Sequence, residues 1–418
     1  MARSDCRSTP DATAARGASG GPPARLRLQA AQLRVWLFDE ALPLWAQRGA
    51  DRLHGGFHEM LDQEGEPTAA AKRARVQARQ AYVFATAGLL GWHGPWQEAA
   101  SRGMAYLQAR YRRSSGLFRT LVSRDGTPLD DSVRLYDQAF VLLAMARLRE
   151  AGFDGGAMET AARELRQGLA EFRHCAGGFR ENSDRPFQAN AQMHLLEASM
   201  AWEAVSGDSG WATMAEEIVG LALDRFIDRQ RGCLLEVFDA SWRPASGDLG
   251  RLTEPGHQFE WSWLLHRFGS RRRDPRALQA ARRLRRAGLA GVDPARGVAI
   301  DEAWSDGSAR QSTARLWPQT EWLKAAIHLG EIEGDWTSAE QAAEALQGYL
   351  ATPICGLWRD RRLETGAMQE EPAPASSFYH IITACSELFR VALRCPAASA
   401  SVAIRGRAVT SAAEMPLL

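Results

Sequence analysis

Residues 231–265 read RGCLLEVFDASWRPASGDLGRLTEPGHQFEWSWLL. The stretch starts with a glycine beside short apolar residues, passes several turn signals, and ends in a run with apolar residues at helical spacing. Pro255 and Gly256 open that predicted helix, and His257 and Glu260 follow three residues apart in its first turns. Two ionisable groups at the start of an otherwise apolar helix need an explanation, and the rest of the chain repeats the arrangement.

Six loop segments of this kind recur along the chain. In each one a glycine precedes an apolar residue and further turn signals follow; the six glycines are Gly56, Gly116, Gly178, Gly232, Gly297 and Gly356. Successive glycines are 60, 62, 54, 65 and 59 residues apart. A near-constant period of this length indicates a repeat architecture.

Amphipathic stretches fill the intervals between the loops. They predict twelve helices, at about residues 26–48, 72–91, 96–113, 131–151, 155–173, 189–206, 210–229, 255–270, 274–290, 311–330, 336–351 and 376–394. Each Gly-containing loop joins an odd helix to the following even helix. Six helical hairpins that bury their faces on one another predict an all-α fold, an (α/α)6 barrel. The odd helices would lie outside and the even helices inside, with the short β-like loops gathered beside the N-termini of the inner helices.

The composition is typical of a soluble globular protein. Of the 418 residues 45% are hydrophobic and 24% are charged, and the formal net charge of +1 gives no electrostatic footprint for nucleic acid or an anionic membrane. No apolar run approaches the roughly 20 residues that span a bilayer. The six cysteines are scattered, which favours free thiols in a reducing compartment. We therefore expect a cytoplasmic protein that binds neither nucleic acid nor membrane, as a monomer or homodimer.

The two ends of the chain have a different composition from the middle. Residues 1–24 are small, polar and rich in Gly and Pro, which predicts a disordered leader, and residues 396–418 are rich in Ala and Ser, which predicts a flexible tail. The intervening residues 25–395 form one predicted catalytic barrel domain.

Every even helix begins with polar or ionisable residues. These are Arg75 and Arg79, Asp137, Asn190 with His194 and Glu197, His257 and Glu260, Arg315 with Trp317, Gln319 and Glu321, and His380. Residues three or four apart share one face of a helix, so six helix starts would converge on one pocket at the barrel mouth. Taken singly, each group has a structural reading, such as helix capping for His257 and Glu260 or a hydrogen-bonded core position for His194. The coincidence of three of the nine histidines at inner-helix starts favours a functional site.

Motifs for metal or cofactor binding are missing from the sequence. His54 and His58 are separated by two glycines, which favours a turn over a helical ligand pair, and there is no H-E-x-x-H, phosphate loop, Rossmann fingerprint or G-x-S-x-G elbow. Lys72 and Lys324 are the only lysines, so a Schiff base has few candidates. We expect no metal and no cofactor.

The motifs QARQAYVF, ANAQMHLLEA, EPGHQFEW, RLWPQTEWLKA and FYHI occur in this order between residues 26 and 394. Together they resemble the N-acylglucosamine 2-epimerase superfamily, and most closely its D-mannose isomerase-like branch. The resemblance implies an (α/α)6 barrel that isomerises or epimerises sugars. It implies catalytic roles for His257, His380 and Arg79 and places His194 and Glu260 in the pocket, and we expect Glu260 to take part in catalysis by orienting His257. The residues that it and the helix pattern together assign to substrate binding are Asn190, His194, Trp317, Gln319, Glu321 and Asp137.

The activity expected from the resemblance is an aldose–ketose isomerisation of a monosaccharide, D-mannose to D-fructose or D-lyxose to D-xylulose. His380 would move the proton between C2 and C1, and His257, oriented by Glu260, would open the sugar ring and move protons between the oxygens. The opposite division of roles between the two histidines is almost equally compatible with the sequence. Arg79 would stabilise the enediolate.

Several alternatives remain open at this stage. A 2-epimerase of the N-acylglucosamine or cellobiose type would use both histidines as opposed bases, although Ala375 replaces an aromatic residue of the cellobiose enzymes. A mannose-6-phosphate isomerase is a further alternative, with Arg75, Arg251 or Arg315 as readers of an anionic group, but no phosphate motif is visible and the free sugar is preferred. A hydrolase using Asp137, Glu260 or Glu321, and a non-catalytic sugar-binding protein, are the rivals from other classes.

Overall fold

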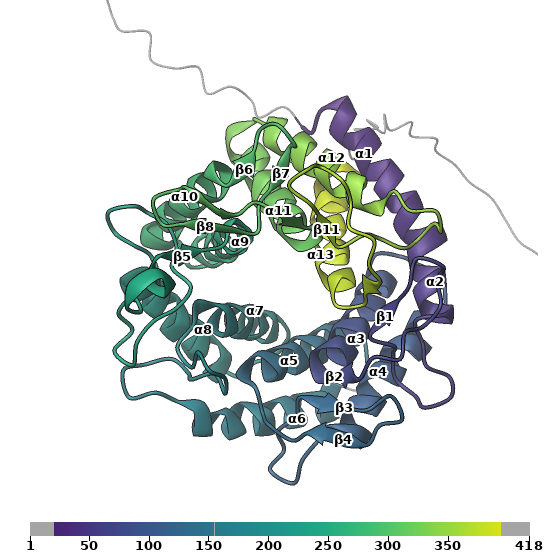
Figure 1. Cartoon of the computed structure of the whole chain (residues 1–418). Helices are drawn as coiled ribbons and strands as arrows, with labels where there is room; N and C mark the ends of the chain where they lie inside the picture. The colour runs from purple at the N-terminus through teal and green to yellow at the C-terminus, as the bar shows by residue number, and fades with distance from the viewer. Residues whose placement is uncertain (1–20, 154, 394–418) are drawn as a thin grey trace, which may run out of the picture.

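The computed structural model describes residues 21–153 and 155–393. Helices arranged in two concentric layers make up most of this part of the chain (Figure 1). The inner layer consists of α3 (Ala74–Leu89), α5 (Leu135–Glu150), α7 (Ala189–Val205), α9 (Pro255–Arg272), α11 (Leu316–Glu333) and α13 (Ser377–Ala392). Each inner helix contacts the next, and α13 contacts α3, so the ring is closed. The predicted (α/α)6 barrel is confirmed.

The outer layer follows the predicted odd helices. It comprises α1 (Ala24–Val35), which runs through the π-helical turn η1 (Trp36–Ala41) into α2 (Leu42–Gln47), then α4 (Trp96–Arg110), α6 (Gly155–Gly168) with η2 (Leu169–Phe172), α8 (Gly210–Leu221) with η3 (Ala222–Phe226), α10 (Pro275–Ala290) and α12 (Thr337–Leu350). Outer helices bury one stripe only. In α10 the buried residues are Ala277, Ala280, Ala281, Leu284 and Gly288, at the spacing of a single helix face.

The predicted helix ends need small corrections. The helix expected from about residue 311 begins at Leu316, because residues 309–311 and 314–315 form short strands, and the helix expected from 131 begins at Leu135. Most of the predicted leader and tail, residues 1–20 and 394–418, lies outside the described residues. No helix among residues 21–153 and 155–393 is long and apolar enough to cross a bilayer.

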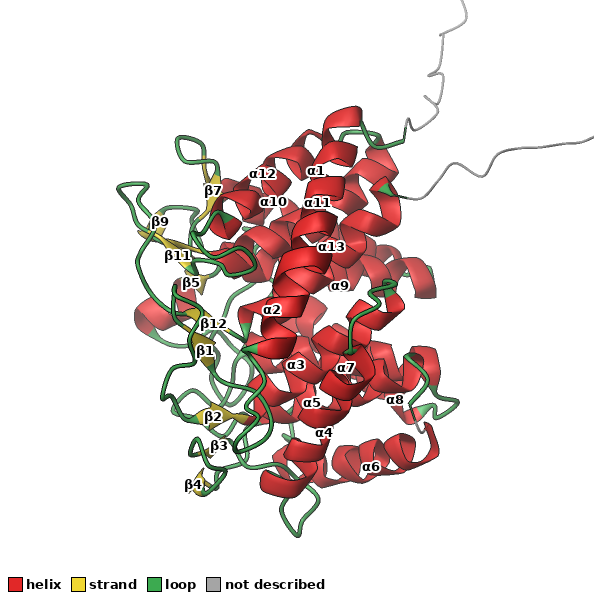
Figure 2. Ribbon diagram, turned by 90° about the vertical axis from the view of Figure 1, so that its right-hand side faces the viewer, coloured by secondary structure: helices red, strands yellow, loops and turns green. Residues whose placement is uncertain are grey.

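Short antiparallel strands gather at one end of the barrel (Figure 2). They are β1 (Met60–Leu61), β2 (Lys72–Arg73), β3 (Leu121–Val122), β4 (Pro128–Asp130), β5 (Leu252–Thr253), β6 (Val292–Asp293), β7 (Val298–Ala299), β8 (Glu302–Trp304), β9 (Ala309–Gln311), β10 (Ala314–Arg315), β11 (Arg361–Arg362) and β12 (Ala373–Pro374). Strand β1 of the first loop pairs with β12 of the last, so the loops also close on themselves. This end holds the N-termini of all six inner helices.

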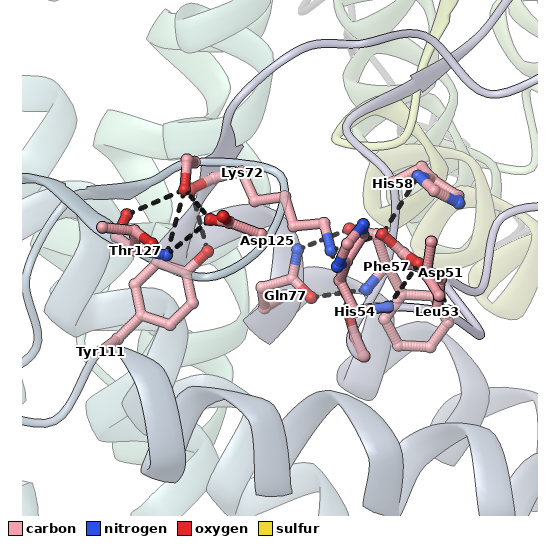
Figure 3. Close-up of polar contacts among 12 residues, drawn as sticks. Asp51, Leu53, His54, Phe57, His58, Lys72, Gln77, Tyr111, Asp125 and Thr127 are labelled. Atoms are coloured by element: carbon pink, nitrogen blue, oxygen red, sulfur yellow. Dashed lines mark hydrogen bonds and ion pairs between the residues drawn. The ribbon is translucent and has the colours of Figure 1, made fainter.

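Five inner helices carry a glutamine that holds the adjacent loop in place. The amides of these glutamines bond the backbone of one loop residue each: Gln77 to Phe57, Gln138 to Phe118, Gln192 to Phe179, Gln258 to Leu234 and Gln319 to Ala299. Figure 3 shows the first of these clamps beside the buried ion pair of Lys72 with Asp51 (2.8 Å). In the sixth helix Phe378 takes the equivalent position and packs on Trp358.

The loop glycine explains the repeat from which the fold was predicted. Gly56 adopts a φ of 68°, and a Cβ there would lie 2.5 Å from Oε1 of Gln77. Gly178 has the same φ, and a Cβ would lie 2.6 Å from Leu221. Only glycine adopts this conformation at low cost and leaves room for the loop to reach the clamp.

Replacing Gln258 with leucine is expected to lower the free energy of unfolding by about 2–6 kcal/mol. Both backbone groups of buried Leu234 lose their partner, and each unsatisfied group costs roughly 1–3 kcal/mol. Chemical denaturation measures the change. The matched control is Gln279→Leu on the exposed face of α10, which should alter stability little. A Gln258→Leu protein as stable as the wild type would contradict the clamp.

Candidate active site at the barrel mouth

The side chains two residues after each clamp glutamine, or after Phe378 in α13, form a run of neighbouring side chains around the inside of the barrel, here called the inner ring. Its members, one from each inner helix in order, are Arg79, Phe140, His194, Glu260, Glu321 and His380. The guanidinium of Arg79 lies 4.0 Å from the centre of the Phe140 ring, and that ring lies 4.5 Å from the His194 ring. Nδ1 of His194 is 3.8 Å from Oε1 of Glu260. Glu260, Glu321 and His380 then bring their polar atoms within 4.8 Å of one another.

The residues two positions before the clamp form a second set closer to the mouth, the mouth ring. Its members are Arg75, Tyr136, Asn190, Gly256, Trp317 and Ser376. Gly256 is required here because a Cβ would lie 2.4 Å from the Trp317 indole. Trp317 itself lies between the two histidines of interest, with ring centres 5.0 Å from His257 and 5.8 Å from His380.

His257 is held by a carboxylate from the loop that precedes its helix. Its Nδ1 donates to Oε2 of Glu236 at 2.9 Å, and Glu254 lies 3.8 Å away. Burial lowers the pKa of His257, but the charges of Glu236 and Glu254 outweigh that effect and raise it to about 10. The imidazole is therefore a cation at neutral pH. The expectation that Glu260 orients His257 is wrong: Glu236 does so, and Glu260 lies beside His194.

Glu236 was missed by the sequence reasoning, although a signal for it exists. An acidic residue stands two positions after the clamped loop residue in five of the six loops: Glu59, Glu181, Glu236, Asp301 and Asp360. These acids lie at the starts of the inner helices. Glu181, for example, accepts the backbone N–H groups of Leu135 and Tyr136, and Asp301 accepts that of Arg315. Glu236 is the member of this set that also reaches a histidine.

His380 has the opposite electrostatic setting. Its Nδ1 lies 2.9 Å from Oε1 of Glu321, which is also ion-paired with Lys324. Burial, reinforced by the positive charges of Arg79 and Lys324, lowers the pKa of His380 well below its usual value of 6.5. The ring is neutral, and the proton on Nδ1 is directed to the carboxylate, so Nε2 retains its lone pair.

Glu260 has no hydrogen-bond partner for either carboxylate oxygen among the described residues, although it is only 1% exposed. Burial and the neighbouring charges of Glu321 and Glu197 raise its pKa well above 4.5. Glu197 accepts a hydrogen bond from Tyr379 and lies 3.6 Å from His194. A buried carboxyl group without a partner favours an interaction that is completed by a ligand.

Arg79 lies between aromatic rings and points to the mouth. It is 5% exposed, donates to the hydroxyl of Tyr136 at 2.8 Å and to the carbonyl of Ser376 at 3.2 Å, and its Nε has no partner among the described residues. A guanidinium held in this way is a preorganised donor for developing negative charge.

Three of the predicted substrate-binding residues are held by other protein groups. Both amide atoms of Gln319 are bonded to Ala299, so its predicted substrate contact is wrong. Asp137 is fully buried and accepts from Arg75 at 2.9 Å. Glu321 is fully buried between His380 and Lys324. Asn190, His194 and Trp317 lie in the mouth and inner rings as expected.

Metal coordination has three conceivable sets of donors among the described residues. They are His194 with Glu197 and Glu260, Glu236 with Glu254 and His257, and Glu260 with Glu321 and His380. In the second set His257 balances the negative charge of the carboxylates, and in the third set Lys324 does so. A cavity of about 730 Å³ lies beside α10, and none of the predicted catalytic residues lines it.

Comparison with known proteins agrees with the family resemblance and with the barrel fold. A protein named mannose-6-phosphate isomerase from Rhizobium meliloti (strain 1021) is 47% identical over 376 residues, covering 87% of this chain and 97% of the relative. A D-mannose isomerase from Thermobifida fusca is 30% identical, covering 72% and 79%. A solved D-mannose isomerase structure superposes with a TM-score of 0.77 at 22% identity, covering 88% and 99%. Residues 55–384 match the family described as N-acylglucosamine 2-epimerase, and the chain belongs to that family.

Proposed function

We propose that the protein is a sugar aldose–ketose isomerase that interconverts D-mannose and D-fructose, or their close analogues, by proton transfer. The observation that carries the proposal is the pair of histidines on either side of Trp317 with oppositely perturbed pKa values. Two neighbouring titratable groups whose environments push their pKa values apart are suited to act as acid and base in one reaction.

His380 is the base in this proposal. Its neutral Nε2 takes the proton from C2 of the open-chain sugar and returns it to C1, while Glu321 holds the ring through Nδ1. His257, held protonated by Glu236, donates its proton to the ring oxygen during opening and takes the proton of the anomeric hydroxyl in return. It then donates a proton to the oxygen on C1 and accepts one from the hydroxyl on C2. Arg79 stabilises the negative charge of the enediolate, and the carboxyl of Glu260 binds a sugar hydroxyl.

The proposed proton transfers need no metal ion, because Arg79, His257 and Lys324 are the cations that stabilise the negative charges of the site. We propose that the enzyme works without a metal and in the cytoplasm. A single base that serves both carbons favours isomerisation, whereas 2-epimerisation needs a second base on the opposite face. A protonated His257 is the group that would return the proton in that reaction, so analysis of the products separates isomerisation from 2-epimerisation.

The proposal is tested by incubating the purified enzyme with D-mannose and, separately, with D-mannose 6-phosphate in the presence of EDTA. Chromatographic analysis is expected to show the corresponding ketose. Glucose or its phosphate in place of the ketose would make the enzyme a 2-epimerase. Absence of any product with either sugar would overturn the proposal.

The pH dependence of kcat/KM follows from the two histidines. The base must be neutral, so activity falls only as pH drops through the His380 pKa, well below 6.5. The acid must be protonated, so activity falls as pH rises through about 10. Glu236→Gln removes one negative charge from His257 and is expected to shift the alkaline limb down by roughly 1–3 pH units without moving the acidic limb.

The control for this profile is Glu344→Gln, which removes a surface carboxylate that pairs with Arg25. That variant should keep both limbs. An unchanged alkaline limb in Glu236→Gln would show that His257 is not the group that sets it.

A further inference from the structure

A cavity of about 300 Å³ opens on the α3, α5 and α7 side of the barrel mouth. Four of the side chains that line it are arginines: Arg73, Arg75, Arg79 and Arg134. Asn190 and Ser376, members of the mouth ring, line it as well. The cavity is therefore continuous with the site proposed for the sugar, because Arg79 belongs to both.

The arginines differ in how their charge is balanced. Arg73 is ion-paired with Glu59, and Arg75 with Asp137. Within the part of the chain that the structure describes, Arg79 donates to the uncharged groups of Tyr136 and Ser376 and to no carboxylate. Arg134 has no ion pair within residues 21–153 and 155–393, and its buried Nε has no hydrogen-bond partner there. Two of the four guanidinium groups thus face the cavity without a carboxylate.

The one acidic residue that lines the cavity does not offset this charge by binding an arginine. The carboxylate of Glu181 accepts the backbone N–H groups of Leu135, Tyr136 and Asn182. Its oxygens are directed to the start of α5. The cavity wall therefore presents an excess of planar N–H donors, the geometry that matches a phosphate group.

We propose that this cavity binds the phosphate of a phosphorylated sugar, with Arg134, whose guanidinium has no carboxylate partner among the described residues, as its principal ligand. The inference rests on the proposed isomerase function and specifies its substrate class. The sugar would place C1 and C2 at His380 and His257 and extend its phosphorylated end across the mouth, toward α3 and α5, which lie on the far side of the ring from α9 and α11 (Figure 1).

The test compares kcat/KM for D-mannose 6-phosphate with that for D-mannose in the wild type and in Arg134→Gln. The wild type is expected to prefer the phosphorylated sugar, and the variant to reduce this preference about 10–100-fold, the effect of losing a charged hydrogen bond. Inorganic phosphate should compete with the sugar phosphate in the wild type and less in the variant. Arg102→Gln, which removes an arginine of the outer helix α4, should keep the preference.

Binding is measured independently of turnover by calorimetry with the His380→Asn protein, alone and combined with Arg134→Gln. Equal efficiency with both sugars, or a preference that survives Arg134→Gln, would overturn the phosphate site while the isomerase function stands. Absence of turnover, with binding of D-mannose 6-phosphate that depends on Arg134, would retain the site and overturn the isomerase function. Absence of Arg134-dependent binding would overturn the site.

Discussion

Replacing His380 with asparagine is expected to lower kcat by about 10²–10⁴-fold, the contribution of a positioned general base. Nε2 of His380 is the atom that would carry the proton between C2 and C1, and asparagine has no basic atom there. The asparagine amide still reaches Glu321, which His380 contacts through Nδ1 at 2.9 Å, so the buried carboxylate keeps a donor. Steady-state kinetics with the preferred sugar measures the effect, and thermal unfolding shows that the fold is retained.

The matched control for His380→Asn is His266→Asn. His266 lies on α9, packs against His328, and belongs to neither the mouth ring nor the inner ring. Its replacement should leave kcat unchanged. Near-wild-type turnover in His380→Asn would contradict the assignment of His380 as the base.

Replacing Arg79 with glutamine is expected to lower kcat by about 10²–10³-fold, because the enediolate loses a preorganised donor. The charge develops only as the C2 proton leaves, so the loss should appear in kcat more than in KM. Arg79 is held by the Tyr136 hydroxyl and by the Phe140 and Tyr379 rings, at 4.0 and 5.2 Å from their centres. The enzyme therefore spends little free energy on orienting it during the reaction.

Arg147 provides the comparison for Arg79. Its guanidinium also lies over a tyrosine ring, 4.8 Å from the centre of the Tyr82 ring, and donates to the Tyr82 hydroxyl. Arg147 lies near the C-terminal end of α5, away from the barrel mouth. Arg147→Gln is expected to affect stability and not kcat. A similar fall in kcat for both variants would mean that the Arg79 effect is structural.

The fold was predictable because the repeated glycine loops and the helical spacing between them are local signals. The glycines occupy backbone conformations that other residues adopt at a cost, so they recur at each hairpin. The exact helix starts were less predictable. The order of polar and apolar residues in 309–315 is compatible with a helix start and also with the short strands β9 and β10 that the structure has there.

The site was predicted in part. The helical spacing places Arg79, His194, Glu260 and His380 at the same level of their helices, and the structure links them through Phe140 and Glu321 in one run of contacts. Gln319 was misassigned because a polar residue at a helix start can point to the pocket or to the adjacent loop. A glutamine recurs at this place in five inner helices. Such recurrence indicates a structural contact with the adjacent loop of each repeat, since a single substrate would not require the same residue in five helices.

The partner of His257 depends on tertiary structure that helical spacing does not reveal. Glu236 lies 21 residues before His257 and reaches it because the loop folds back over its own helix start. Glu260 is closer in sequence, three residues away, but its side chain points toward His194. Residues three apart on a helix share a face without being in contact, and here the loop carboxylate occupies the place beside the imidazole.

The most direct test of the two-histidine account is proton NMR of the reaction in D₂O with EDTA present, using D-mannose and D-mannose 6-phosphate. With two histidines in these roles, we expect the ketose to appear and to carry deuterium at C1 in part of the product, because His380 exchanges some of the proton it transfers with solvent. Exclusive formation of the C2 epimer, or turnover that begins only after a divalent metal is added, would contradict it.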